Sequence, residues 1–136
     1  MKIKILKVFR LLLIIMFSYT LFHKIFDMKS FLDTLKKSTI IEDYQISIIL
    51  YLTPFLEFIT ILALFLWKRI EGFYLSFILM LIFTIYLIAL NNFSLYKGCS
   101  CGGIFNELSY LEHIIVNCSF IIISLLSILL FEKEEK

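Results

Sequence analysis

Four long apolar segments restrict the fold of this chain more than any other feature. They cover residues 8–26, 44–67, 73–90 and 114–131. Eighteen residues of α-helix rise about 27 Å, which is close to the thickness of the hydrocarbon core of a bilayer. Because lipid offers the backbone no hydrogen-bond partners, a spanning segment must pair its own peptide groups, as a helix does. The pattern therefore predicts an all-α fold, a polytopic membrane bundle of four transmembrane helices.

The composition agrees with a membrane protein and excludes several other classes. Of the 136 residues, 61% are hydrophobic and 18% are charged, whereas soluble domains are about half apolar and about a quarter charged. Such a chain is neither disordered nor an ordinary soluble enzyme. The net charge of +2 is too small to indicate a nucleic-acid partner. At this length we expect a single domain over residues 1–136.

The lysines and arginines predict the orientation in the membrane. Residues 8–26 follow a basic start, but no small-residue cleavage site comes after them, so we interpret them as a retained span and not a signal peptide. With the N-terminus inside, the inner face carries Lys2, Lys4, Lys7, Arg10, Lys68, Arg69, Lys133 and Lys136, and the outer face carries Lys24, Lys29, Lys36, Lys37 and Lys97. This eight-to-five bias places both termini in the cytoplasm and the longer loops, about 27–43 and 91–111, outside.

A cysteine pair lies in the second outer loop, where residues 98–103 read Gly-Cys-Ser-Cys-Gly-Gly. A disulfide needs Cα atoms about 4.4–6.8 Å apart, and an extended C-x-C is near the top of that range, so closure needs a local turn. The flanking glycines permit unusual backbone angles. A small, strained, exposed disulfide exchanges readily and is a poor staple for the chain. We therefore expect Cys99 and Cys101 to form a redox-active disulfide outside the cytoplasm, with a static clip as the alternative.

Neighbouring residues leave other uses open. His113 is either a base beside the thiols or an interfacial histidine next to Glu112. Cys99, Cys101 and His113 would also suit a three-ligand site for Cu(I) or zinc, although we expect no resident metal. Cys118 lies within the fourth span, where a lone cysteine usually packs as a small apolar residue, and a relay thiol is the alternative.

Polar residues also occur inside the spans. Glu57 is near the middle of the second span, three residues after Pro54, and a carboxyl at that depth is usually paired, protonated or functional. Lys24 is the expected partner, provided that the first helix continues past Phe26; otherwise Lys24 extends to the outer surface. Helical spacing predicts three inward stripes: Thr20, Lys24 and Asp27; Thr53, Glu57 and Thr60; and His113, Asn117, Ser124 and Ser127. These stripes predict a polar interior beneath the outer face, which either locks the helices together or takes part in chemistry.

Four features in chain order carry a resemblance to a known family. They are Lys24-x-x-Asp27, Pro54-x-x-Glu57, the C-x-C of residues 98–103, and Asn117. Over about residues 18–128 the chain resembles the MauE/DoxX-like redox-associated membrane proteins. The resemblance implies a multi-pass protein of the bacterial inner membrane that works beside an exported thioredoxin-like protein in disulfide formation or thiol maintenance. The candidate catalytic residues are then Cys99, Cys101 and His113, and the intramembrane polar residues are Lys24, Asp27, Glu57 and Asn117.

The bundle also looks like that of vitamin K epoxide reductase, in which redox cysteines stand at the head of a helix. That likeness makes a quinone a candidate cofactor, although the first outer loop has no second cysteine pair. Thiol-disulfide oxidoreductase activity is the leading hypothesis. A copper- or zinc-handling membrane protein that uses the same thiols, and a non-catalytic subunit that docks an exported enzyme, are the alternatives.

Overall fold

A computed structural model describes residues 1–38, 41–66, 70–93 and 109–135 of the chain. Its helices are α1 (Lys2–Phe26), α2 (Met28–Lys37), α3 (Asp43–Phe65), α4 (Glu71–Phe93) and α5 (Tyr110–Glu135). Within the described residues, the four helices other than α2 are long and apolar enough to cross a membrane. The predicted all-α bundle with four membrane-spanning helices is therefore confirmed.

The spanning helices extend beyond most of the predicted apolar segments. Helix α1 begins at Lys2 instead of residue 8, and α5 covers Tyr110–Glu135 instead of 114–131. Lysine and glutamate are good helix formers, so a helix continues through charged residues that lie beyond the hydrocarbon core. Hydropathy marks the apolar core of a span, whereas the backbone hydrogen bonds decide where its helix ends.

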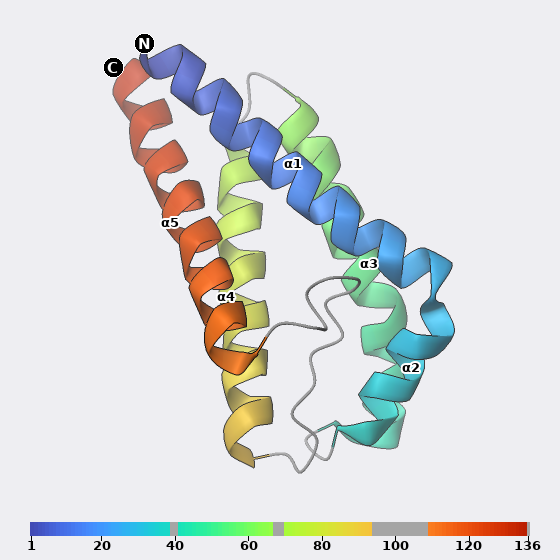
Figure 1. Cartoon of the computed structure of the whole chain (residues 1–136). Helices are drawn as coiled ribbons and strands as arrows, with labels where there is room; N and C mark the ends of the chain where they lie inside the picture. The colour runs from blue at the N-terminus through green and yellow to red at the C-terminus, as the bar shows by residue number, and fades with distance from the viewer. Residues whose placement is uncertain (39–40, 67–69, 94–108, 136) are drawn as a thin grey trace.

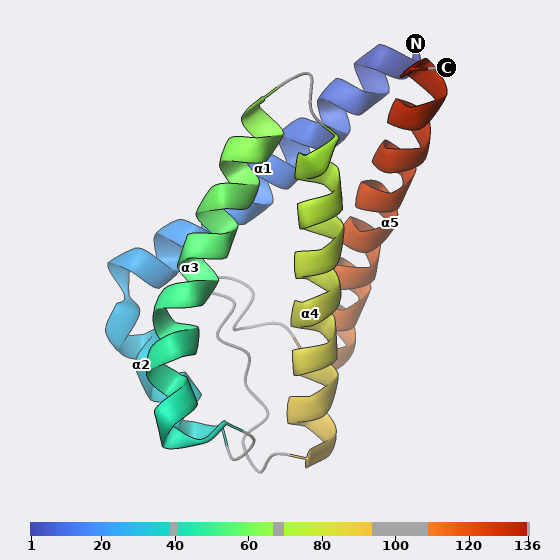
Figure 2. The same ribbon diagram turned by 180° about the vertical axis from the view of Figure 1, so that it is seen from behind.

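The four spans close into a ring, because α1 packs against α3 and α5, and α4 packs against the same two helices. Both termini lie side by side at one end of the bundle (Figures 1 and 2). From that end the pair α1 and α3 diverges from the pair α4 and α5 (Figures 1 and 2). Helix α2 follows α1 at the diverging end and packs on α3 (Figure 1).

Helix α2 replaces part of the first outer loop that the sequence predicted. Asp27 separates α1 from α2, and its Oδ1 accepts a hydrogen bond from Ser30 N at 3.2 Å, which caps the start of α2. Phe31 and Leu35 are one helical turn apart and both are buried. This short apolar stripe holds an amphipathic helix against the bundle.

The buried apolar residues form two separate clusters. The first joins the four spans and consists of Leu6, Leu13, Met16, Phe17, Leu64, Phe73, Leu79, Met80 and Ile128. The second joins α2 to α3 and consists of Phe31, Leu35, Ile46 and Leu50. The outer face is also apolar, as lipid contact requires: Ile15, Ile48, Phe55, Ile85 and Ile122 are each more than half exposed.

Gly72 marks the closest approach between α3 and α4. A Cβ atom at this position would lie 2.7 Å from Leu64 N and 2.8 Å from Ala63 C. These are backbone atoms and have no rotamer to change. The absence of a side chain at Gly72 therefore allows the first turn of α4 to pack directly on the last turns of α3.

Candidate functional site

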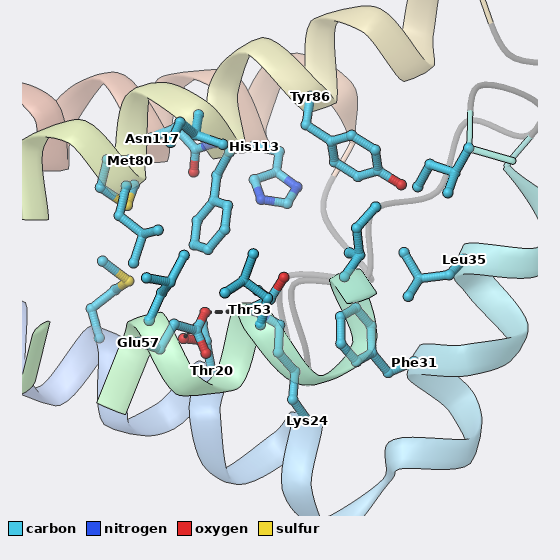
Figure 3. A pocket seen from close by; sticks show the side chains of 18 of the residues that line it. Thr20, Lys24, Phe31, Leu35, Thr53, Glu57, Met80, Tyr86, His113 and Asn117 are labelled. Atoms are coloured by element: carbon cyan, nitrogen blue, oxygen red, sulfur yellow. Dashed lines mark hydrogen bonds and ion pairs between the residues drawn. The ribbon is translucent and has the colours of Figure 1, made fainter. Parts of the chain in front are cut away.

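A buried ion pair joins α1 to α3. Lys24 Nζ donates a hydrogen bond to Glu57 Oε1 at 2.5 Å, and the two side chains are 5% and 0% exposed (Figure 3). Thr20 Oγ1 lies 3.3 Å from the same carboxylate oxygen and 3.1 Å from Phe17 O, so its single proton can serve either acceptor. The pairing expected from the sequence is present. It needs no extension of α1 past Phe26, because Lys24 already faces α3 from the last turn of α1.

Aromatic rings enclose the remaining side of the Lys24 ammonium. Its Nζ lies 4.9 Å from the ring centroid of Phe83 on α4 and 5.6 Å from that of Phe31 on α2. Both distances are within the range of cation–π attraction. Lys24 therefore contacts α2, α3 and α4 inside the bundle instead of extending to the outer surface.

The burial of Lys24 changes the charge count behind the predicted orientation. Arg10, counted on the inner face, is also buried, with its guanidinium carbon 5.1 Å from the ring centroid of Phe73. Without these two buried residues the count becomes seven against four. The direction of the bias is unchanged, and the orientation in the membrane stays a prediction.

A cavity of about 420 Å³ borders the ion pair and is lined by residues of all five helices. It lies between the two apolar clusters: Met16 and Met80 of the first cluster line it, as do Phe31 and Leu35 of the second. Its polar lining residues are Thr20, Lys24, Gln45, Thr53, Glu57, Tyr86, His113 and Asn117. His113 and Asn117 lie across the cavity from Lys24 and Glu57 (Figure 3).

The polar stripes predicted on α3 and α5 face inward, but they form less of a polar interior than expected. Ser124 and Ser127 are fully buried, and their hydroxyls donate to the carbonyls of Phe120 and Ile123 on the same helix, at 2.9 and 2.7 Å. Thr60 bonds its own helix in the same way. These hydroxyls are therefore satisfied within a single helix. The Thr20, Lys24 and Glu57 side chains, which meet between α1 and α3, border the cavity, whose walls are otherwise mainly apolar.

Two predicted positions are wrong. Asp27 is exposed and caps α2, so it does not continue the inward stripe of Thr20 and Lys24; the helix break at Asp27 turns it away. Cys118 is exposed and does not pack inside the bundle. It follows Asn117, which faces the cavity, and one residue turns an α-helix by about 100°, so Cys118 faces outward.

Cys99 and Cys101 lie outside the described residues. The structure resumes at Ser109, whose N–H donates to Glu112 Oε2 at 2.9 Å while Glu112 N donates to Ser109 Oγ at 3.3 Å. This capping box starts α5 and places His113 in its first turn, 3% exposed and lining the cavity. The Ser-x-x-Glu signal before the fourth apolar run is present in the sequence and marks the start of α5.

Other lining residues could not be recognised from the sequence. Phe31 lies in α2, and Phe83 and Tyr86 lie three residues apart in α4. All three occupy ordinary apolar positions, and nothing in their spacing along the sequence links them to Lys24. Among the described residues, no group of three or more histidine, cysteine, aspartate or glutamate side chains is placed to hold a metal ion.

The fold and the site together define a multi-pass helical membrane protein with a buried Lys–Glu pair beside an internal cavity. Residues 2–130 match the family described as methylamine utilisation protein MauE. The match covers nearly the whole chain, so the chain belongs to the MauE family, as its motifs indicated. Comparison with curated proteins gives no match, and comparison with solved structures gives none either.

Proposed function

We propose that this member of the MauE family is an integral membrane thiol–disulfide redox protein. The observation that carries the proposal is the C-x-C pair, Cys99 and Cys101, within the part of the chain that matches the family. The chain between α4 and α5 joins two helix ends that lie toward the end of the bundle away from both termini (Figure 1). With the termini in the cytoplasm, that end faces the extracytoplasmic side of the bacterial inner membrane, where disulfide chemistry proceeds.

The proposed reaction is exchange with the cysteines of an exported thioredoxin-like partner. A thiolate of the Cys99–Cys101 dithiol attacks the partner's disulfide, forming a mixed disulfide and releasing one partner thiolate. The second cysteine then attacks the mixed disulfide, which closes the Cys99–Cys101 disulfide and releases the second partner thiolate. Two electrons and two protons pass to the partner, and the same steps run in reverse. We assign His113 the role of a base beside the thiols, and the Lys24–Glu57 pair the role of fixing α1 against α3.

Trapping of the mixed disulfide tests this proposal. The variants Cys99→Ser and Cys101→Ser each retain one thiol of the pair, and the one that keeps the attacking cysteine should accumulate a reductant-sensitive adduct with an exported partner in intact cells. Cys118→Ser is the matched control, because Cys118 is exposed on α5 and should leave trapping unchanged. If neither variant traps a partner and both still support full maturation of the partner, the proposal is wrong.

Two further measurements separate the alternatives. An accessory docking role predicts that the double variant Cys99→Ser, Cys101→Ser still supports maturation of the partner, whereas the redox role predicts that it does not. A metal-handling role predicts tight binding of copper or zinc by the purified, reduced protein. The orientation is tested separately with a membrane-impermeant thiol reagent, which should label Cys99 and Cys101 in intact cells.

A further inference from the structure

Only one of the two carboxylate oxygens of Glu57 accepts hydrogen bonds from the described residues. Lys24 Nζ and Thr20 Oγ1 both approach Glu57 Oε1, whereas Glu57 Oε2 is buried and accepts no hydrogen bond within the described part of the chain. Glu57 is 0% exposed and lines the cavity. Buried carboxylate oxygens are costly unless they accept a hydrogen bond. An acceptor without a donor therefore lies at the border of the cavity, where the hydroxyl of a bound molecule would satisfy it.

The chemistry of the cavity limits which class of molecule can bind there. An ionised carboxylate only accepts hydrogen bonds, so the ligand must supply a donor. The volume of about 420 Å³ is within the range of small-molecule pockets. The walls are mainly apolar and include the ring of Phe83, together with the rings of Phe31 and Tyr86 (Figure 3). A flat apolar ring that carries a hydroxyl group fits both the walls and the acceptor.

A second polar contact is available on the opposite wall. His113 and Asn117 of α5 lie across the cavity from Glu57 (Figure 3). The Asn117 amide offers both a donor and an acceptor. A ring with oxygen substituents at its two opposite ends would place one oxygen toward Glu57 and the other toward α5.

The route into the cavity leads through lipid. Leu52 on α3 and Ile82 on α4 line the cavity, yet they are 46% and 51% exposed at the outer face of the bundle. Leu52 and Ile82 lie on neighbouring helices and touch both the cavity and the outer surface, so the cavity adjoins that surface at the junction of α3 and α4. In a bilayer this surface contacts acyl chains. A ligand that enters here must be soluble in the membrane.

We propose that the cavity binds the ring of a membrane-soluble quinol, with one ring hydroxyl donating to Glu57 Oε2 and the opposite oxygen facing Asn117 and His113. A quinone of the same structure has no ring donor, so the site favours the reduced form. The proposal concerns binding alone and does not rest on thiol exchange by Cys99 and Cys101.

Binding is measured with the purified full-length protein in lipid nanodiscs. The probes are decylubiquinol, held reduced under anaerobic conditions, decylubiquinone, and 1-dodecanol, which carries a hydroxyl group without a ring. The expected result is saturable binding of the quinol, at least tenfold tighter than binding of the quinone or the alkanol. Equal binding of quinol and quinone, or equal binding of quinol and alkanol, would overturn the proposal.

Variants test the site without relying on the ion pair. Ile82→Trp places a bulky ring where the cavity reaches the outer face and should weaken quinol binding at least tenfold. Ile85→Trp is the matched control on the same helix: Ile85 is 64% exposed and is not among the residues that line the cavity. If both variants bind the quinol like the unmodified protein, the proposed route and cavity are wrong.

The Glu57→Gln variant tests the contact directly, because a purely structural role of Glu57 would not change the preference between quinol and quinone. Lys24 donates to one oxygen, so the glutamine oxygen should turn toward Lys24 and its NH₂ group should take the place of Oε2. That donor suits a quinone carbonyl, and the preference should shift from quinol to quinone. An unchanged preference in the folded variant would contradict the contact with Oε2.

The double variant Cys99→Ser, Cys101→Ser should bind the quinol as the unmodified protein does. Loss of binding in this variant would contradict a site that is independent of the thiols. Failure of the trapping experiment thus leaves quinol binding in place, and failure of quinol binding leaves thiol exchange in place.

Discussion

Removal of one partner of the Lys24–Glu57 pair should cost far more stability than removal of both. Lys24→Met keeps an unbranched side chain, one atom shorter, and removes its charge, which leaves a carboxylate that is 0% exposed without its cation. Glu57→Leu leaves the ammonium uncompensated in the same way. The double variant replaces the pair by apolar side chains of similar size, which suit the surrounding walls.

The geometry gives the expected magnitudes. At the observed separation of 2.5 Å, two unit charges attract by about 6–7 kcal/mol at an effective dielectric constant of ~20. Desolvation costs several kcal/mol for each ion, so the intact pair contributes little net free energy of folding. Each single variant should lose about 3–5 kcal/mol of unfolding free energy, and the double variant should lie within about 2 kcal/mol of the unmodified protein.

Steric trapping in bicelles measures the free energy of unfolding for this comparison. Lys29→Met on α2 is the matched control, since Lys29 is exposed and its loss should change stability by no more than about 0.5 kcal/mol. The reasoning is refuted if Lys24→Met is as mild as Lys29→Met, or if the double variant loses the sum of the two single losses. Either result would mean that the two charges are not coupled in the folded bundle.

Three smaller perturbations test the fold. Gly72→Ala should destabilise the protein by about 1–3 kcal/mol in the same assay, because the added Cβ would meet Leu64 N at 2.7 Å; a neutral effect would contradict this close packing. Cys118→Ala should change stability by less than about 0.5 kcal/mol, since the side chain is exposed, and a loss near 2 kcal/mol would indicate that it is packed. Asp27→Ala removes the cap of α2 and should cost about 1 kcal/mol and increase amide exchange in α2, whereas Asp33→Ala, at an exposed position on the same helix, should do neither.

The spans and the inward polar positions follow from local features of the sequence. Span length depends on the length of an apolar run and the rise of a helix, and both can be read directly from the residues. The period of the helix likewise places His113 on the same face as Asn117, and Glu57 on the same face as Thr60, as the structure shows. The pairing of Lys24 with Glu57 was predictable because few charges lie within the apolar segments.

The tertiary structure decided how those faces meet. Lys24 and Glu57 are 33 residues apart, and the rings of Phe31 and Phe83 reach the same ammonium from two further helices. The rotation of a helix about its axis is set by its packing against neighbours, which is why Cys118 faces outward although its apolar surroundings in the sequence favoured packing. Packing likewise directs Lys24 and Thr20 to one oxygen of Glu57 and leaves the other oxygen without a donor among the described residues. This asymmetry depends on distances between helices and has no counterpart in the order of residues.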